Sequence, residues 1–304
     1  MNKNKGFLLV SVMALISGVV VFISKFGVTV INPYIFTALK NIIVVLVVVS
    51  WLLMMRDWRI LKSLTKKQWF ILSAIGIIGG SIPFLLYFKG LSLTIPVQAA
   101  FIHKTMFICV AVLAAVFLKE KISRGFLIGG LSLLFGNILL LRIIPHQFGM
   151  GDLLILIATL FWATENVISK HLLKELPPRI IIWGRMFFGS ILIAIFLIAT
   201  GQMNLMFSLN AQQIGWTMIT SIFLFTALAA WYTGLKYIKV SVATTVLLLA
   251  SPITTLLSLF FLGQTLVLSQ VLGIVLIALA VFWIYKTSTL SMEYHEQKES
   301  ARSI

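Results

Sequence analysis

Charged side chains inside long apolar segments are the residues of this sequence whose chemistry most needs an explanation. Four of them occur, Lys40, Lys104, Glu165 and Arg185, and His103 stands beside one of them. If these segments cross a membrane, each charge costs about 2.5–3.5 kcal/mol on insertion scales, so each should serve either structure or function. Buried cations can bind a carboxylate or phosphate, a buried acid can bind an ammonium group, and an imidazole can carry a proton.

The overall composition identifies the apolar segments as membrane spans. Hydrophobic residues make up 60% of the 304 residues, charged residues make up 11%, and the mean hydropathy is +1.08. A soluble protein has about 25% charged residues. Because a spanning helix takes about 20 residues, we expect ten, near residues 7–28, 33–55, 69–89, 96–117, 125–144, 152–171, 180–200, 213–235, 241–261 and 266–286. The predicted fold class is an all-α integral membrane protein. After the tenth span we expect a disordered cytoplasmic tail at 287–304.

The net charge of +16 is explained by membrane topology rather than by nucleic-acid binding. If the N-terminus is cytoplasmic, eighteen of the 24 Lys and Arg residues fall in segments on the cytoplasmic side. The positive-inside rule favours this orientation. We therefore expect a protein of the cell membrane with both termini in the cytoplasm. Its expected partners are membrane lipid and a small-molecule substrate, and it is expected to be a monomer or a weak homodimer.

An internal repeat divides the ten spans into two halves. Residues 24–40 and 169–185 both contain Ser-Lys, then a Pro eight residues after the Lys, then a cation seven residues after the Pro. The offset between the copies is 145 residues here and 144 further along the chain. The predicted units are 6–145 and 151–286, each with five spans, so the second must insert upside down relative to the first. Two inverted five-helix repeats are typical of alternating-access carriers, which bind substrate near the middle of the membrane.

The repeat motifs resemble those of the drug/metabolite transporter superfamily, in its ten-helix form with two EamA-type repeats. The residues that carry the resemblance are Ser24-Lys25…Pro33…Lys40, Ser169-Lys170…Pro178…Arg185, and the repeat ends AAVFLKEKIS (114–123) and LSLFFLGQTL (257–266). The resemblance covers residues 6 to 286. It implies a carrier of small organic solutes, often moved outward, with a central cavity lined by the first, third, fourth, sixth, eighth and ninth spans.

The sequence departs from the family pattern at three positions. Lys40 stands where that family more often has Arg, Ile108 stands where the second repeat has Pro252, and Gln264 replaces the acid that Glu120 supplies. These departures affect individual contacts and leave the expected fold unchanged.

The repeat also separates the intramembrane charges into two classes. Lys40 and Arg185 are equivalent positions, so we expect them to serve the architecture, for example by bonding backbone carbonyls near helix bends. Lys104 and Glu165 have aliphatic residues as their counterparts and are therefore predicted to bind substrate. A structural ion pair is the alternative for both of these residues.

Depth in the membrane distinguishes the two predicted binding residues. At about 1.5 Å rise per residue, Glu165 and Arg185 reach a similar level and form the better-matched ion pair. Lys104 then has no acid at its own depth, which favours an anionic ligand group there. The remaining predicted substrate-binding residues are His103, Trp162, Tyr87, Trp231 and Tyr232. For each aromatic residue, simple packing is the alternative to substrate binding. For His103, the alternatives are a hydrogen-bonded packing role and a role in proton coupling.

Secondary transport is the function class that the residues favour. The intramembrane charges sum to +2, which suggests a substrate with a carboxylate, such as an exported amino acid, or a phosphorylated or nucleotide-type solute moved by exchange. An enzyme is not expected, because the sequence has no G-x-S-x-G, no H-E-x-x-H and no clustered acids, and a pump would need a P-loop. A non-transporting scaffold or receptor would gain little from buried charges. No cofactor or metal is expected, since Cys109 is the single cysteine and His103 has no ligand partner at suitable spacing.

Overall fold

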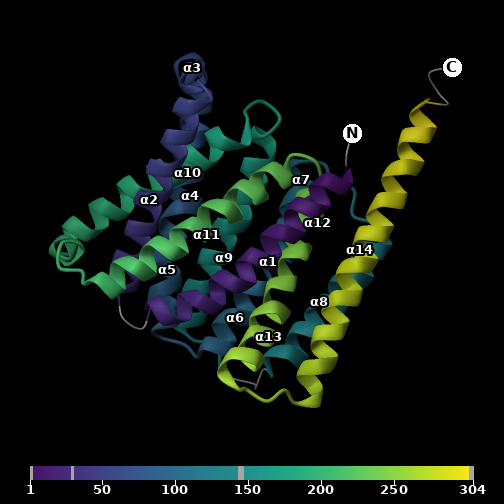
Figure 1. Cartoon of the computed structure of the whole chain (residues 1–304). Helices are drawn as coiled ribbons and strands as arrows, with labels where there is room; N and C mark the ends of the chain where they lie inside the picture. The colour runs from purple at the N-terminus through teal and green to yellow at the C-terminus, as the bar shows by residue number, and fades with distance from the viewer. Residues whose placement is uncertain (1–2, 29–30, 143–146, 301–304) are drawn as a thin grey trace.

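The computed structural model describes residues 3–28, 31–142 and 147–300, and within these ranges the chain is all-helical (Figure 1). Its elements are α1 Lys3–Val28, α2 Pro33–Met54, α3 Trp58–Ser63, α4 Lys66–Gly80, α5 Ile82–Leu91, α6 Pro96–Lys104, α7 Met106–Phe117, α8 Arg124–Leu141, α9 Met150–Leu172, α10 Pro178–Ala199, η1 Met203–Met206, α11 Ala211–Leu235, α12 Val240–Val246, η2 Leu247–Leu249, α13 Ala250–Leu262 and α14 Leu268–Ser300. The predicted all-α class is confirmed.

The helices form ten spans that are long and apolar enough to cross a membrane within the described residues. Seven spans are single helices, and three are built from shorter pieces: α4 with α5, α6 with α7, and α12 with η2 and α13. The chain is a multi-pass membrane protein, as expected. Residues 143 and 144, at the end of the fifth predicted span, lie outside the described residues. Both described ends of the chain lie at the same end of the bundle as α3 (Figure 1).

The two five-span halves interdigitate, so the core forms between them. The first helix of the first half, α1, packs on α11 and α13 of the second half. In the same way, α9 opens the second half and packs on α4, α5 and α7 of the first half. Each half therefore depends on the other for the burial of its third and fourth spans.

The last spans of the two halves, α8 and α14, are held together by close backbone contact. A Cβ added at Gly129 would lie 2.3 Å from Cγ1 of Ile284, and one added at Gly273 would lie 2.7 Å from the carbonyl oxygen of Gly136. Small residues at such crossings allow helix backbones to approach one another within a membrane. Gly129 and Gly136 of α8 therefore pack against α14, which is the last span of the other half.

Charged residues of the repeat motifs bind backbone groups at helix ends. The Lys170 Nζ donates to the carbonyl oxygens of Leu235 at 2.6 Å and Ile238 at 2.7 Å, where α11 ends. The Glu120 Oε1 accepts from the backbone amide of Val240 at 2.9 Å, at the start of α12. Both contacts satisfy backbone groups that a helix end leaves without intrahelical partners.

The tail differs from its expected form. Disorder is predicted from residue 287, whereas α14 continues as a helix to Ser300. No Gly or Pro interrupts residues 287–300, and Glu, Gln, Lys, Met and Leu are good helix formers. Residues 301–304 lie outside the described residues.

The contact between α4 and α10 gives a test of the fold. A Cβ at Gly189 would lie 2.8 Å from the carbonyl oxygen of Gly80, which is backbone and cannot move aside easily. We expect Gly189→Ala to lower the free energy of unfolding by about 1–3 kcal/mol. Thermal unfolding in detergent micelles, followed by size-exclusion chromatography, measures this loss.

The matched control is Gly215→Ala in α11, where an added Cβ meets nothing within 4 Å. Alanine there should raise stability by about 0.5–1 kcal/mol, because glycine is a poor residue for a helix interior. Equal stability of the two variants would contradict the close α4–α10 contact.

Candidate functional site

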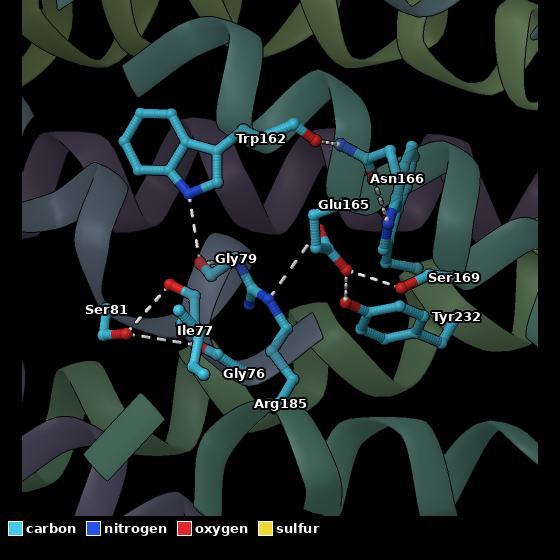
Figure 2. Close-up of polar contacts among 12 residues, drawn as sticks. Gly76, Ile77, Gly79, Ser81, Trp162, Glu165, Asn166, Ser169, Arg185 and Tyr232 are labelled. Carbon is cyan, nitrogen blue, oxygen red and sulfur yellow. Dashed lines mark hydrogen bonds and ion pairs between the residues drawn. The ribbon is translucent and has the colours of Figure 1, made fainter. Parts of the chain in front are cut away.

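A broken third span supplies the backbone acceptor at the centre of the site. Pro83 lies one turn after Gly79 and has no N–H, so the Gly79 carbonyl lacks its normal helical donor. Two side chains from the other half replace that donor. The Trp162 Nε1 donates to the Gly79 oxygen at 3.1 Å, and the Arg185 Nη2 donates to it at 3.0 Å (Figure 2).

The next carbonyl along the broken span is satisfied in a similar way. At the break, Ser81 has φ −141° and ψ −73°, and the amide of Phe84 bonds to Ser81 instead of Gly80. The Gly80 oxygen accepts from the Asn41 Nδ2 at 3.1 Å. The break is thus bonded to α2, α9 and α10 at once.

Glu165 is the acid of this site, and each of its oxygens has a partner. Its Oε1 accepts from the hydroxyls of Ser169 and Tyr232, each at 2.6 Å, and its Oε2 lies 3.9 Å from the Arg185 Nε (Figure 2). The expected Glu165–Arg185 ion pair is therefore present. Glu165 is only 2% exposed and Arg185 only 9%, so water hardly screens the pair.

Close approach of Glu165 requires the glycine opposite it. A Cβ at Gly79 would lie 2.3 Å from the Cγ of Glu165 and 3.2 Å from the Arg185 Nε. Gly79 therefore contributes twice, by a carbonyl that has no helical donor and by its missing side chain.

Two tryptophans are held in fixed orientations beside this network. The Trp231 Nε1 donates to the Asn166 Oδ1 at 3.1 Å, and the Asn166 Nδ2 donates to the carbonyl of Trp162 at 2.8 Å. The ring of His103 lies 4.9 Å from the ring of Trp162, centroid to centroid, and the ring of Tyr87 lies 5.7 Å from both. The rings of Tyr87, His103 and Trp162 therefore form one connected cluster.

A cavity of about 330 Å³ lies between the two halves and contacts this network. Side chains from the first, third, fourth, sixth, eighth and ninth spans line it, which includes every span that the family resemblance implies. The seventh span adds Arg185. Apart from the charged network, the walls are mostly apolar and aromatic, with Met13, Phe84, Phe107 and Leu228 among them.

The structure brings most of the predicted substrate-binding residues to this cavity. Those that line it are His103, Lys104, Trp162, Glu165, Trp231 and Tyr232. Tyr87 stands behind the wall and packs against the rings of His103 and Trp162.

Lys104 differs from the other charged residues of the cavity because nothing neutralises it. Among the residues that the structure describes, none forms a hydrogen bond or an ion pair with its ammonium group. The neighbouring His103 also has a buried Nδ1 without a hydrogen-bond partner. These two groups can accept a ligand without first losing a protein contact.

The two repeat-equivalent cations occupy different surroundings. Arg185 bonds the Gly79 carbonyl beside a helix break. Lys40 does not line the cavity, and its Nζ lies 4.3 Å from the ring centroid of Phe36. An architectural role for both residues stays a prediction.

Sequence reasoning missed the residues that form the break in the third span or bond to it, namely Gly79, Pro83 and Asn41. Pro83 carried a usable signal, since a proline inside a predicted span frees the carbonyl four residues earlier. Asn41 also carried one, as a polar residue within an apolar run. Nothing in the sequence shows which side chains would reach the freed carbonyl.

Comparison with known proteins agrees with this arrangement. The profile of the EamA-like transporter family matches residues 4–142 and 149–286, which is nearly the whole chain in two copies. The chain belongs to the EamA-like transporter family. The two matched ranges coincide with the two five-span halves.

Two individual similarities accompany the family match of this EamA-like chain. It is 27% identical over 233 residues to a Bacillus subtilis (strain 168) protein described as the uncharacterized transporter YyaM, covering 72% of this chain and 74% of YyaM. A crystal structure described only as that of a protein superposes with a TM-score of 0.80 at 18% identity, covering 94% of this chain and 99% of the other. That second match shows the fold. Family and relative are both described as transporters rather than enzymes.

The buried ion pair gives a testable energetic consequence. Arg185→Gln removes the positive charge and leaves the Glu165 carboxylate buried without it. We expect this variant to lose about 3–5 kcal/mol of stability, because an uncompensated buried charge is strongly unfavourable. Thermal unfolding of purified protein in detergent measures the loss.

The double variant Glu165→Gln/Arg185→Gln is the control, since it removes both charges and has the same glutamine at position 185 as the single variant. Its stability should recover most of the loss caused by Arg185→Gln alone. A double variant that unfolds as early as the single variant would show that the charge pair is not the cause.

Proposed function

We propose that this protein is a secondary transporter that exports a small organic solute bearing a carboxylate, such as an amino acid, by alternating access around the central cavity. The observation that carries the proposal is the Lys104 ammonium group, which lines the cavity and has no neutralising partner in the part of the chain that the structure describes. The charges of Glu165 and Arg185 offset one another. The cavity therefore has one uncompensated positive charge, which suits one anionic group of a solute.

The size of the cavity supports a small solute over a nucleotide-type one. Ligand pockets commonly enclose about 300–1,000 Å³, and this cavity, at about 330 Å³, is at the lower limit. A single uncompensated lysine also suits a carboxylate better than a doubly charged phosphate. A scaffold without transport would gain nothing from an open space with a free lysine in it.

The apolar walls suggest the rest of the solute. Trp162, Trp231, Phe84 and Phe107 present aromatic surface to the cavity. A solute with an apolar or aromatic body would bury that surface against them. An amino acid of this kind also carries an ammonium group, and both oxygens of Glu165 already have partners. We therefore place the ammonium group against the tryptophan faces, where cation–π attraction is strongest.

Alternating access is supported by the arrangement of the broken spans. The third, fourth and ninth spans are interrupted near the cavity, and helix interruptions at the middle of the membrane are typical of carriers built from inverted repeats. Because the halves interdigitate, motion of one half against the other changes the walls of the cavity. Export is proposed because carriers of this family often move solutes outward.

Transport assays on Lys104 variants test the proposal. Counterflow of radiolabelled amino acids in proteoliposomes should identify a transported solute. With that solute, Lys104→Gln should raise the half-saturation concentration by about 30-fold, which corresponds to a loss of about 2 kcal/mol for a buried charged contact. Lys104→Arg, which keeps the charge, should retain part of the affinity.

The matched control is Lys40→Gln, which removes the same charge from an apolar span outside the cavity. It should leave the half-saturation concentration unchanged, even if it lowers the yield of folded protein. Unchanged transport by Lys104→Gln, or an equal effect of both variants, would contradict the assignment of Lys104.

A further inference from the structure

A second hollow lies on the outside of the bundle, on the opposite face of α9 from the central cavity. It is an apolar groove of about 460 Å³ between α4, α7 and α9. Phe70, Ala74, Leu113, Phe117 and Val167 contribute to its walls. We refer to this hollow as the lateral groove.

The lateral groove opens toward the surrounding membrane. Phe70 is 73% exposed and Phe117 is 70% exposed, so two large aromatic side chains stand open beside it. Along α9 the groove extends from Thr164 to His171, which at about 1.5 Å per residue is about 10 Å. That length suits the upper part of one lipid acyl chain, since half of the hydrocarbon core is about 15 Å thick.

Cations gather where the lateral groove meets the membrane surface. The start of α4 and the ends of α7 and α9 lie at this mouth. Lys67 is one helical turn before Phe70, Lys119 directly follows a lining residue, and Lys174 is three residues after His171. The three lysines are exposed, so their charges are open to a ligand.

The acidic residues next to Lys119 and Lys174 in the sequence already have partners. Glu175 accepts a hydrogen bond from the Gln68 Nε2 at 2.9 Å, and Glu120 binds the start of α12. These contacts leave the charge of each carboxylate in place, but the start of α4 and the segments after α7 and α9 hold five lysines, Lys66, Lys67, Lys119, Lys121 and Lys174, against these two acids, so the mouth of the lateral groove has a net positive charge above an apolar floor. This combination matches a phospholipid with a negatively charged headgroup, which is the kind of lipid that basic pockets between spans bind on the cytoplasmic side.

We propose that the lateral groove is a binding site for one anionic phospholipid of the surrounding membrane. An acyl chain lies between α4, α7 and α9, and the headgroup phosphate lies among Lys67, Lys119 and Lys174. The lipid covers the face of α9 that is opposite to Trp162 and Glu165. It thereby packs against the helix that supplies the central network. The proposal rests on the groove and its charges and is independent of which solute is transported.

Native mass spectrometry of the full-length protein in detergent tests this site. Dioleoylphosphatidylglycerol and dioleoylphosphatidylcholine are added in equal amounts, and the retained lipid is counted. We expect one phosphatidylglycerol to be retained in preference to phosphatidylcholine. The triple variant Lys67→Gln/Lys119→Gln/Lys174→Gln should lower phosphatidylglycerol retention by about tenfold or more, because each lysine near a lipid surface contributes about 1 kcal/mol.

The matched control is Lys5→Gln/Lys236→Gln/Lys286→Gln. It removes the same charge from exposed positions at the same end of the bundle, on elements that do not line the lateral groove. It should retain phosphatidylglycerol as the unaltered protein does. Equal loss in both triple variants would mean that the lipid responds to the total charge of this face, and the proposal would fail.

A change in the apolar floor tests the groove without altering any charge. Ala74→Phe places a large ring in the lateral groove and should abolish the preferred retention of one phosphatidylglycerol. The lysine substitutions are on the surface and should not affect folding. The comparison of the two triple variants therefore tests the proposal even if Ala74→Phe does not fold. Equal retention of the two lipids by the unaltered protein would overturn the proposal directly.

Discussion

The central constraint of this structure is the backbone carbonyl of Gly79, which Pro83 deprives of a helical donor. A carbonyl left without a partner in an apolar interior is costly, so the protein must supply donors from elsewhere. Trp162 and Arg185 supply them, and both belong to the opposite half of the molecule. One proline thereby fixes how α9 and α10 meet the third span. The position of the cavity and the depth of Glu165 both follow from that meeting.

The network also explains why a buried acid is tolerated at this depth. Glu165 has a guanidinium group near one oxygen and two hydroxyl donors on the other. These contacts offset part of the desolvation penalty of the carboxylate, while the Arg185 Nε stays buried without a hydrogen-bond partner among the described residues. Lys104 has no such compensation among the described residues, and for this reason we propose that its charge is the one available to a ligand.

The sequence predicted the fold well because its signals are local or periodic. Apolar run length defined the ten spans, and the repeat of Ser-Lys, Pro and cation defined the halves. Local signals say less about the polar tail, where α14 continues as helix to Ser300 and the expected disorder stays a prediction.

The candidate site could be predicted only in part. Lys104 and Glu165 were predicted because each has an aliphatic residue as its counterpart in the other repeat. Glu165 was predicted to pair with Arg185 because both lie at a similar depth in the membrane. Hydrogen-bond partners could not be predicted, because the contacts to Gly79 and Gly80 join residues from 39 to 106 positions apart. The lateral groove could not be predicted from the sequence either, because it depends on the spacing of α4, α7 and α9 in the folded protein.

The network around Gly79 has no copy in the other half of the chain. By the repeat offset, the counterpart of Gly79 is Phe223, that of Pro83 is Ala227 and that of Glu165 is Val20. In a carrier with identical halves, the two halves would exchange conformations during transport and the two end states would have equal energy. Here the counterparts of Gly79, Pro83 and Glu165 lack the residue types that the network needs. Only one of the two halves can therefore supply the bonded carbonyl of a broken third span, and only the other can supply the buried ion pair. In the proposed transport cycle, this network favours one end state of the empty protein, and binding of the solute must supply the free energy that makes the other state accessible.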